Sequence, residues 1–400
     1  MTKKTVKEIN KTIKLIVGSD NGNSEHDIVI NGNLIQQPNV YAKISRLPNL
    51  DEVNPLSYAN DIENHLIATI TSQRLNNGTP TTYFVGNYAI NSGNHVYNIE
   101  IGADNSKLDS DIPFVNTLAQ IAGYGASMAY LEDNTVEEIT IDVDMTTALP
   151  VNQYSKDASL KMSEQFIGKH KVSIYFGTKI VNCNLIFDYV KTIPEAVPTV
   201  FYLQSNKDSE VFEEYKKDYK LQEVDFENKK ILHVAIGEGT TEYPLTNDIA
   251  FNPSFLTGTN NGVGLAIESI IEDFRKDYRL PVYTRQDFSS ALKNPNNKYH
   301  TKAVDYVQEQ LEYQSEEIFR TVKREVEKAK NDVDIIAVYG GGSILMKKYL
   351  KQKIAKFADE ALIQVLYIDK PFSVSIEALG MYEFTKSDVY KNLKEKFINK

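Results

Sequence analysis

The sequence of 400 residues has very little cysteine and histidine and no long apolar run. Cys183 is the only cysteine, so an intrachain disulfide is impossible. The six histidines are scattered and do not form the clusters typical of a structural zinc site. The apolar runs are far shorter than the roughly 20 residues needed to span a bilayer, and no signal-peptide core follows the first residues. These absences predict a cytoplasmic protein without a membrane span.

Positive charge is also scarce, because 54 aspartate and glutamate residues outnumber 44 lysine and arginine residues and give a net charge of −10. Sequence-independent DNA binding draws its affinity from lysine and arginine contacts to phosphates. We therefore expect no direct DNA binding, and we expect any contact with DNA to require an adaptor protein. A hydrophobic content of 42% is ordinary for a globular protein and is enough to bury the cores of two lobes.

Three glycine-containing turns, each following an apolar run, are the main positive feature of the sequence. They are residues 19–24 after 13–17, residues 237–241 after 231–236, and residues 340–343 after 335–339. Glycine lets backbone N–H groups approach phosphate oxygens closely, and Ser, Thr and Asn side chains add neutral donors. Spacings of roughly 215 and 100 residues exclude a single Rossmann or P-loop unit, whose phosphate loop and helix lie within about 30 residues. Two lobes must therefore converge on one nucleotide.

The hydrophobic pattern indicates alternating strands and helices, as in a layered α/β lobe. It predicts strands near 13–18, 26–31, 40–44, 81–90, 138–146, 171–176 and 180–189, and helices over 116–131 and 301–330. Pro194 and Pro198 bracket a predicted hinge. Residues 205–230 are strongly charged and predict a surface insertion, for which charge alone favours a solvated helical segment over a filament contact.

The order of the three turns resembles the superfamily of actin, the large heat-shock chaperones and the sugar kinases. In that superfamily, two phosphate hairpins from different lobes and a glycine-rich adenosine turn enclose ATP and its metal. Three segments are most similar to the bacterial plasmid-segregation actins, the ParM and Alp-type proteins. These segments are residues 83–89 (YFVGNYA), 111–118 (DIPFVNTL) and 193–198 (IPEAVP).

This resemblance implies an α/β, actin-like two-lobed fold of duplicated ribonuclease H-like domains with the nucleotide in the cleft between them. We expect residues 1–198 to form the first lobe, completed by 372–400, and residues 199–371 to form the second. The polar side of the helix over 301–330 is expected beside the adenine. The basic residues 1–11 predict a flexible or docking arm, whereas a membrane anchor there would suit an MreB-like cell-shape protein.

The resemblance also identifies candidate residues for binding ATP or ADP and Mg²⁺. Asp20 matches the acid that holds Mg²⁺ through bound water, and a simple Asx turn is the alternative. A lysine often follows the first turn in the family, and this chain has His26 and Asp27 there. The residues expected to contact the nucleotide are Gly22, Asn23, Ser24, Gly237, Glu238, Gly239, Thr240, Thr241, Gly340, Gly341, Gly342 and Ser343.

Hydrolysis is assigned to Glu195, Asp20 and the position of Ala235. Glu195 matches the hinge glutamate that orients the attacking water, although an acid directly after Pro194 also suits a helix N-terminus. Ala235 stands where the superfamily has an aspartate. We interpret it as an engineered Asp-to-Ala change that slows hydrolysis, with a natural alanine as the alternative.

The function implied by the resemblance is that of a bacterial, cytoplasmic ATPase that assembles into helical filaments. Such filaments segregate plasmid DNA through a small DNA-binding adaptor of ParR type on a centromere-like site. An MreB-like cytoskeletal filament and a small-molecule kinase are the alternatives, because one fold hosts several functions.

Overall fold

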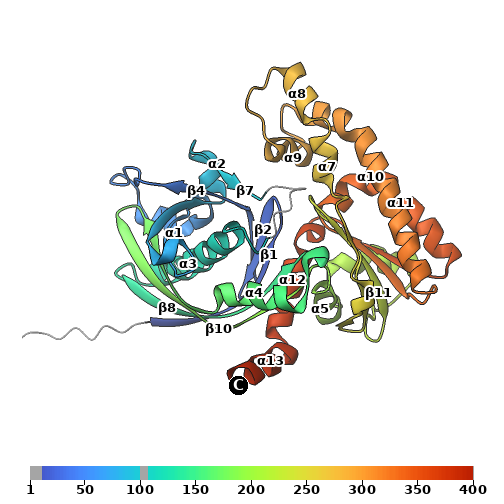
Figure 1. The fold of residues 1–400 in the computed structure, drawn as a ribbon, viewed down its shortest axis with the longest axis horizontal. Helices are drawn as coiled ribbons and strands as arrows, with labels where there is room; N and C mark the ends of the chain where they lie inside the picture. The colour runs from blue at the N-terminus through green and yellow to red at the C-terminus, as the bar shows by residue number, and fades with distance from the viewer. Residues whose placement is uncertain (1–10, 100–106, 400) are drawn as a thin grey trace, which may run out of the picture.

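The computed structural model describes residues 11–99 and 107–399, which form two lobes (Figure 1). Each lobe is built on a sheet that is covered by helices, so the expected α/β, two-lobed fold is confirmed. The basic arm expected over residues 1–11 lies, except for Lys11, outside the described residues.

The sheet of the first lobe is mixed and has ten described strands. Its order is β3 (Asn33–Pro38), β2 (Glu25–Ile30), β1 (Lys11–Asn21), β8 (Glu138–Leu149), β10 (Lys179–Pro194), β9 (Gly168–Phe176), β5 (Ile67–Thr71), β6 (Thr81–Val85), β4 (Val40–Ile44), β7 (Tyr97–Asn98). β8 pairs in parallel with β1 and β10, and β1 forms an antiparallel hairpin with β2. Ile13, Leu15 and Val17 of β1 are buried on one face, as the two-residue period of a strand requires.

The sheet of the second lobe repeats this plan around β11. Its order is β14 (Ala250–Phe251), β13 (Leu245–Asn247), β11 (Lys230–Ile236), β12 (Thr241–Glu242), β15 (Gly258–Thr259), with β16 (Ile335–Tyr339) parallel to β11 and β17 (Gln364–Tyr367) parallel to β16. β11 and β12 form an antiparallel hairpin, as β1 and β2 do. Both lobes therefore place a hairpin turn at the carboxyl end of a strand with a parallel neighbour, the edge at which α/β proteins bind ligands.

Helices cover both sheets. They are α1 (Pro55–Asn60), α2 (Asn87–Asn91), α3 (Ile112–Glu132), α4 (Lys156–Phe166), α5 (Thr199–Ser205), α6 (Glu213–Tyr219), α7 (Val263–Glu268), α8 (Ile271–Tyr278), α9 (Arg285–Lys293), α10 (His300–Lys328), α11 (Gly341–Glu360), α12 (Phe372–Lys386) and α13 (Asp388–Ile398). Short 3₁₀ turns lie at Ile62–Asn64, Asn76–Gly78, Val151–Gln153, Glu210–Phe212 and Pro253–Phe255. α7, α8 and α9 form the upper part of the second lobe in Figure 1, and α10 and α11 line its outer side.

The expected strand over 81–90 is wrong in its second half. β6 ends at Val85, Gly86 has φ +59°, and α2 follows. A Cβ atom on Gly86 would lie 2.3 Å from Oε1 of Gln37, and that oxygen accepts a hydrogen bond of 2.9 Å from the N–H of Asn87. The glycine therefore turns the chain where the apolar pattern alone predicted a longer strand.

The charged segment 205–230, for which charge alone favoured a solvated helical segment, also contributes buried aromatic residues to the second lobe. Its aromatic residues Phe212, Tyr215 and Phe226 are buried in one cluster with residues of β11 and β16. The hydroxyl of Tyr215 also donates a hydrogen bond of 2.5 Å to Oε1 of Gln364. The segment thus covers a face of the second sheet with an apolar layer, and its charged side chains lie outside that layer. A filament contact through them stays a prediction.

α12 returns the chain to the first lobe by packing closely against β1 and α5. A Cβ atom on Gly18 of β1 would lie 2.3 Å from the backbone nitrogen of Tyr382, and one on Gly380 would lie 2.3 Å from the carbonyl oxygen of Pro198. The two glycines therefore allow α12 to contact the first sheet and the hinge at once. The domain boundary between residues 198 and 199 stays a prediction.

Gly18→Ala is expected to destabilise the protein by about 2 kcal/mol, because an added methyl group in a packed backbone contact forces the elements apart. The measurement is the midpoint of urea unfolding. Gly341→Ala is the matched control, since no heavy atom lies within 4 Å of the Cβ position at Gly341. Equal midpoints for the two variants would contradict the close contact between β1 and α12.

Candidate nucleotide-binding site

The three glycine turns meet in one pocket between the lobes. The turn between β1 and β2 contributes Asp20, Gly22, Asn23 and Ser24, the turn after β11 contributes Gly237 and Glu238, and the turn before α11 contributes Gly340, Gly341 and Gly342. Segments far apart in the sequence therefore form one site, as their residue types suggested. Their roles toward a nucleotide remain predictions.

The first turn is tightly packed around Gly22. A Cβ atom on Gly22 would lie 2.7 Å from the carbonyl oxygen of Glu25, and the side chain of Asn39 donates a hydrogen bond of 2.7 Å to the carbonyl of Gly22. The hydroxyl of Ser24 is buried and has no hydrogen-bond partner among the described residues. It lines the pocket and can donate to a ligand oxygen.

The second turn places fewer residues in the pocket than expected. Gly237 and Glu238 line it, whereas Gly239, Thr240 and Thr241 are not among the described lining residues. The hydroxyl of Thr241 donates a hydrogen bond of 2.9 Å to the carbonyl of Asn261, within the second lobe. Its side chain therefore connects β12 to the segment that precedes α7.

The third turn is shaped by glycine. Gly340 has φ +95°, and a Cβ atom there would lie 2.4 Å from the carbonyl oxygen of Ile236. Gly341 and Gly342 begin the 20-residue helix α11 and line the pocket, so the N–H groups of its first turn can meet an anion there. Ser343 is buried, and its hydroxyl donates to the carbonyl of Gly340 at 2.8 Å. This serine closes the turn and does not line the pocket.

Behind the first turn, the hinge acid Glu195 forms a buried ion pair. Oε1 of Glu195 lies 2.5 Å from Nζ of Lys107, and the two side chains are 13% and 5% exposed. Burial alone would lower the pKa of Lys107, but Glu195 and then Asp20 raise it above its usual range, so this lysine is charged. The ion pair fixes the position of the Glu195 carboxylate. Glu195 itself is not among the described lining residues.

Asp20 lines the pocket and lies within electrostatic range of this pair. Burial, followed by the charge of Glu195, raises the pKa of Asp20 to about 7. Glu377 of α12 also lines the pocket, and its carboxylate accepts a hydrogen bond of 2.7 Å from the N–H of Ala196. Burial and then Asp20 raise the pKa of Glu377 well above its usual range. No group of three His, Cys, Asp or Glu side chains within the described part of the chain forms a ready metal cage.

Ala235 has an acidic partner on the neighbouring strand. It lies directly opposite Glu242 in the β11–β12 hairpin, so both side chains are on the same face of the sheet. Glu242 is 2% exposed, and burial followed by Glu195 raises its pKa to about 8. Gly258 leaves room for it, since a Cβ atom there would lie 2.4 Å from Oε2 of Glu242.

Sequence reasoning missed several residues of the cleft. The position of Glu242 could have been found from a local spacing, because it follows Ala235 by seven residues just as Asp27 follows Asp20. In each hairpin, the two residues of the pair lie directly opposite each other. The other missed residues, Lys107, Ser289, Lys293 and Glu377, lie far along the chain from all three turns or give no local pattern. The pocket lining includes Ser289 and Lys293 of α9 and no described residue of α10, and the expectation that the polar side of α10 lies beside the adenine stays a prediction.

This arrangement, two lobes with a shared cleft entered by a hairpin from each, defines an actin-like fold. A family model described as archaeal actin homologue MreB-like, C-terminal, matches residues 233–352. Comparison with curated proteins finds no significant match. In the described part of the chain, no helix is both long and apolar enough to cross a bilayer.

Three solved structures show the extent of the likeness. The actin-like protein Alp7A is 17% identical with a TM-score of 0.66, over 96% of this chain and 99% of that one. Bacillus thuringiensis ParM with ATP is 15% identical with a TM-score of 0.61, over 95% and 99%. Ta0583, an archaeal actin homologue, is 17% identical with a TM-score of 0.60, over 93% and 99%. The expected actin-like fold is confirmed, and Alp7A and ParM are among the proteins that share it.

Glu242→Gln is expected to make stability less dependent on pH. The folded pKa of Glu242, about 8, lies above its ordinary value of 4.5, so the folded state binds an extra proton between these values. Stability from this group is present below the ordinary value and is lost as pH rises through about 8. Without nucleotide, the melting temperature of the wild type should therefore fall more steeply than that of the variant from about pH 5 to about pH 8.5.

The control is Glu223→Gln, which changes an exposed glutamate on the second lobe. It should follow the wild-type pH curve. Parallel curves for the wild type and Glu242→Gln would show that Glu242 does not take up a proton on folding.

Proposed function

We propose that this protein is a nucleotide-dependent polymerising ATPase of the actin-like fold. The observation that carries this proposal is the convergence of three glycine turns on one pocket between the lobes. A ligand held by both lobes couples nucleotide state to the angle between them. The ATP, AMPPNP and ADP structures of Bacillus thuringiensis ParM support a nucleotide as that ligand.

The pocket residues suit a Mg²⁺–nucleotide complex. Gly22, Asn23 and Ser24, with Gly237 and Glu238 opposite, would hold the phosphates, while Gly340–Gly342 would lie against the ribose and base. Gly239, Thr240, Thr241 and Ser343 would shape these turns. Asp20 fits a Mg²⁺ ion held through water, because its carboxylate lines the pocket and a nearby cation would favour its ionised form. The metal would neutralise phosphate charge.

Hydrolysis would depend on carboxylates positioned around an attacking water. The ion pair with Lys107 orients Glu195, which we assign to the water. Ala235 supplies no carboxylate, and Glu242 opposite it provides an acid on the same face of the sheet. We infer slow turnover that depends on Glu242, whether Ala235 is engineered or natural.

The polymer would be a head-to-tail filament, because a contact between different surfaces that does not close gives an open helix. The resemblance to ParM and Alp7A favours plasmid segregation in the bacterial cytoplasm, through a ParR-type adaptor on a centromere-like site. The net charge of −10 agrees with leaving DNA contact to that adaptor.

The match of residues 233–352 to an MreB-like model favours a cytoskeletal filament as the second candidate. Binding of assembled filaments to lipid vesicles would favour that candidate.

The first experiment is sedimentation with electron microscopy of the purified protein, with and without ATP or a non-hydrolysable analogue and Mg²⁺. We expect filaments only with nucleotide. The control is Gly341→Tyr, since the open space at the Gly341 Cβ position lets a large side chain fill the pocket without displacing backbone. It should abolish both nucleotide binding and assembly. Nucleotide binding without polymer well above micromolar concentrations would contradict the filament and favour a kinase, which a coupled assay with sugars and acids would detect.

Ala235→Asp is expected to raise ATP turnover on the order of tenfold, because it restores a carboxylate beside the site of water attack. Glu242→Gln should lower the residual turnover of the chain with Ala235, with nucleotide affinity changed only a few-fold. Phosphate release at saturating Mg²⁺–ATP measures both. Unchanged turnover in Ala235→Asp would remove position 235 from the proposed mechanism, and unchanged turnover in Glu242→Gln would remove Glu242.

A further inference from the structure

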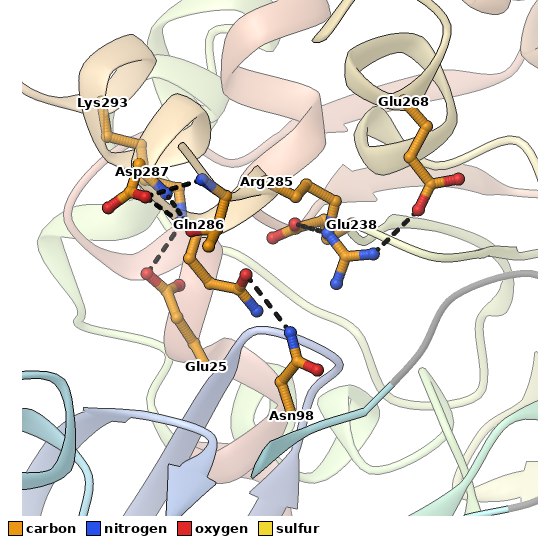
Figure 2. Close-up of polar contacts among 9 residues, drawn as sticks. Glu25, Asn98, Glu238, Glu268, Arg285, Gln286, Asp287 and Lys293 are labelled. Atoms are coloured by element: carbon orange, nitrogen blue, oxygen red, sulfur yellow. Dashed lines mark hydrogen bonds and ion pairs between the residues drawn. The ribbon is translucent and has the colours of Figure 1, made fainter. Parts of the chain in front are cut away.

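Helix α9 is anchored to the second turn of the pocket by a buried arginine. Nε of Arg285 lies 2.8 Å from Oε1 of Glu238, and Nη1 lies 3.0 Å from Oε1 of Glu268 (Figure 2). The Arg285 and Glu238 side chains are each 11% exposed, so solvent screens this pair weakly. Because Glu238 belongs to the turn after β11, this pair fixes α9 to the second lobe.

The other end of α9 reaches across the cleft to the first lobe. Nζ of Lys293 lies 2.8 Å from Oε1 of Glu25, the first residue of β2 (Figure 2). Lys293 follows Arg285 by eight residues and Ser289 by four, so these side chains project from one side of the helix. Nδ2 of Asn98 in β7 donates a weaker hydrogen bond of 3.4 Å to Oε1 of Gln286 and gives a second contact between the lobes.

The pair between Glu25 and Lys293 is part of the pocket wall. Both residues line the pocket, beside Asp27, Ser24 and Glu238. The Glu25 and Lys293 side chains are 42% and 34% exposed, so dissolved salt can screen the attraction between them. Burial alone would lower the pKa of Lys293, but Glu25, Glu238 and Asp27 together raise it, so the lysine keeps its charge.

We propose that Glu25 and Lys293 form an ionic strap that closes the mouth of the pocket and limits the rate at which bound nucleotide leaves. The inference rests on the proposed nucleotide binding. Arg285 holds α9 to the second turn, so breaking the strap frees the lobes to separate without disturbing the phosphate turns. The strap then acts on release, while the turns determine contact with the nucleotide.

The test is the dissociation rate of a fluorescent ADP analogue, chased with excess ADP and Mg²⁺ at a protein concentration too low for assembly. Glu25→Gln and Lys293→Met should each raise the rate about fivefold, as expected for loss of a partly exposed ion pair. The exchanged pair Glu25→Lys with Lys293→Glu should restore the rate to within about twofold, because the attraction is re-formed with opposite polarity. Rising salt should accelerate release from the wild type and leave Lys293→Met unchanged.

Lys276→Met is the matched control, since Lys276 pairs at 3.5 Å with Asp273 on α8 and this pair does not cross the cleft. It should release ADP at the wild-type rate. A faster rate in Lys293→Met that is absent in Glu25→Gln and not repaired by the exchange would overturn the strap and make Lys293 a direct nucleotide ligand. Equal rates in all variants would also overturn it. Failure of the wild type to bind the analogue would instead contradict the proposed function.

Discussion

The ionisation of the acidic groups in the cleft is governed by one constraint: the buried carboxyl groups at the hinge outnumber the buried positive charges near them. Among the described residues at the hinge, the ammonium group of Lys107 lies near the carboxyl groups of Asp20, Glu195 and Glu377 and affects Glu242 as well. One cation cannot balance four carboxylates in a medium of low dielectric constant, so protons remain on some of them near neutral pH. A cation that enters the pocket would favour their ionised forms. Entry of a cation into the pocket and ionisation of the hinge carboxyl groups would therefore be linked.

This charge cluster exists only because distant parts of the chain meet. Asp20 comes from β1, Glu195 from the hinge, Glu242 from β12 and Glu377 from α12. The return of α12 between the lobes is possible because glycine removes two side chains from its contacts with β1 and α5. Packing and electrostatics are thus coupled, since a displaced α12 would also move a carboxylate away from the hinge.

The parts of the site that could be predicted are those in which residue type and local chain geometry coincide. Glycine after an apolar strand indicates a turn open to phosphate, and all three such turns lie in the pocket. Local pattern said nothing of Lys107 or Lys293, because a single lysine in a surface-like segment carries no information about what it meets in the fold. The strand expected over 81–90 was too long for a related reason. The alternation of apolar and polar residues does not show where a glycine with positive φ turns the chain.

The two lobes have the same kind of antiparallel hairpin, but the acidic residues lie at different positions in the two hairpins. In the first, Asp20 on the outgoing strand lies opposite Asp27 on the return strand, whereas the second has Ala235 opposite Glu242. Opposite residues of a hairpin share a face and lie equally far from the turn, so an acid at position 242 instead of 235 keeps a carboxylate on the same side of the sheet but puts it on the neighbouring strand. The phosphate-sized turn is unaffected by that exchange, because its shape depends on glycine and backbone hydrogen bonds. Under the proposed function, nucleotide binding and closure would therefore be retained while hydrolysis is tuned, which is the separation that a filament with a long-lived assembled state would require.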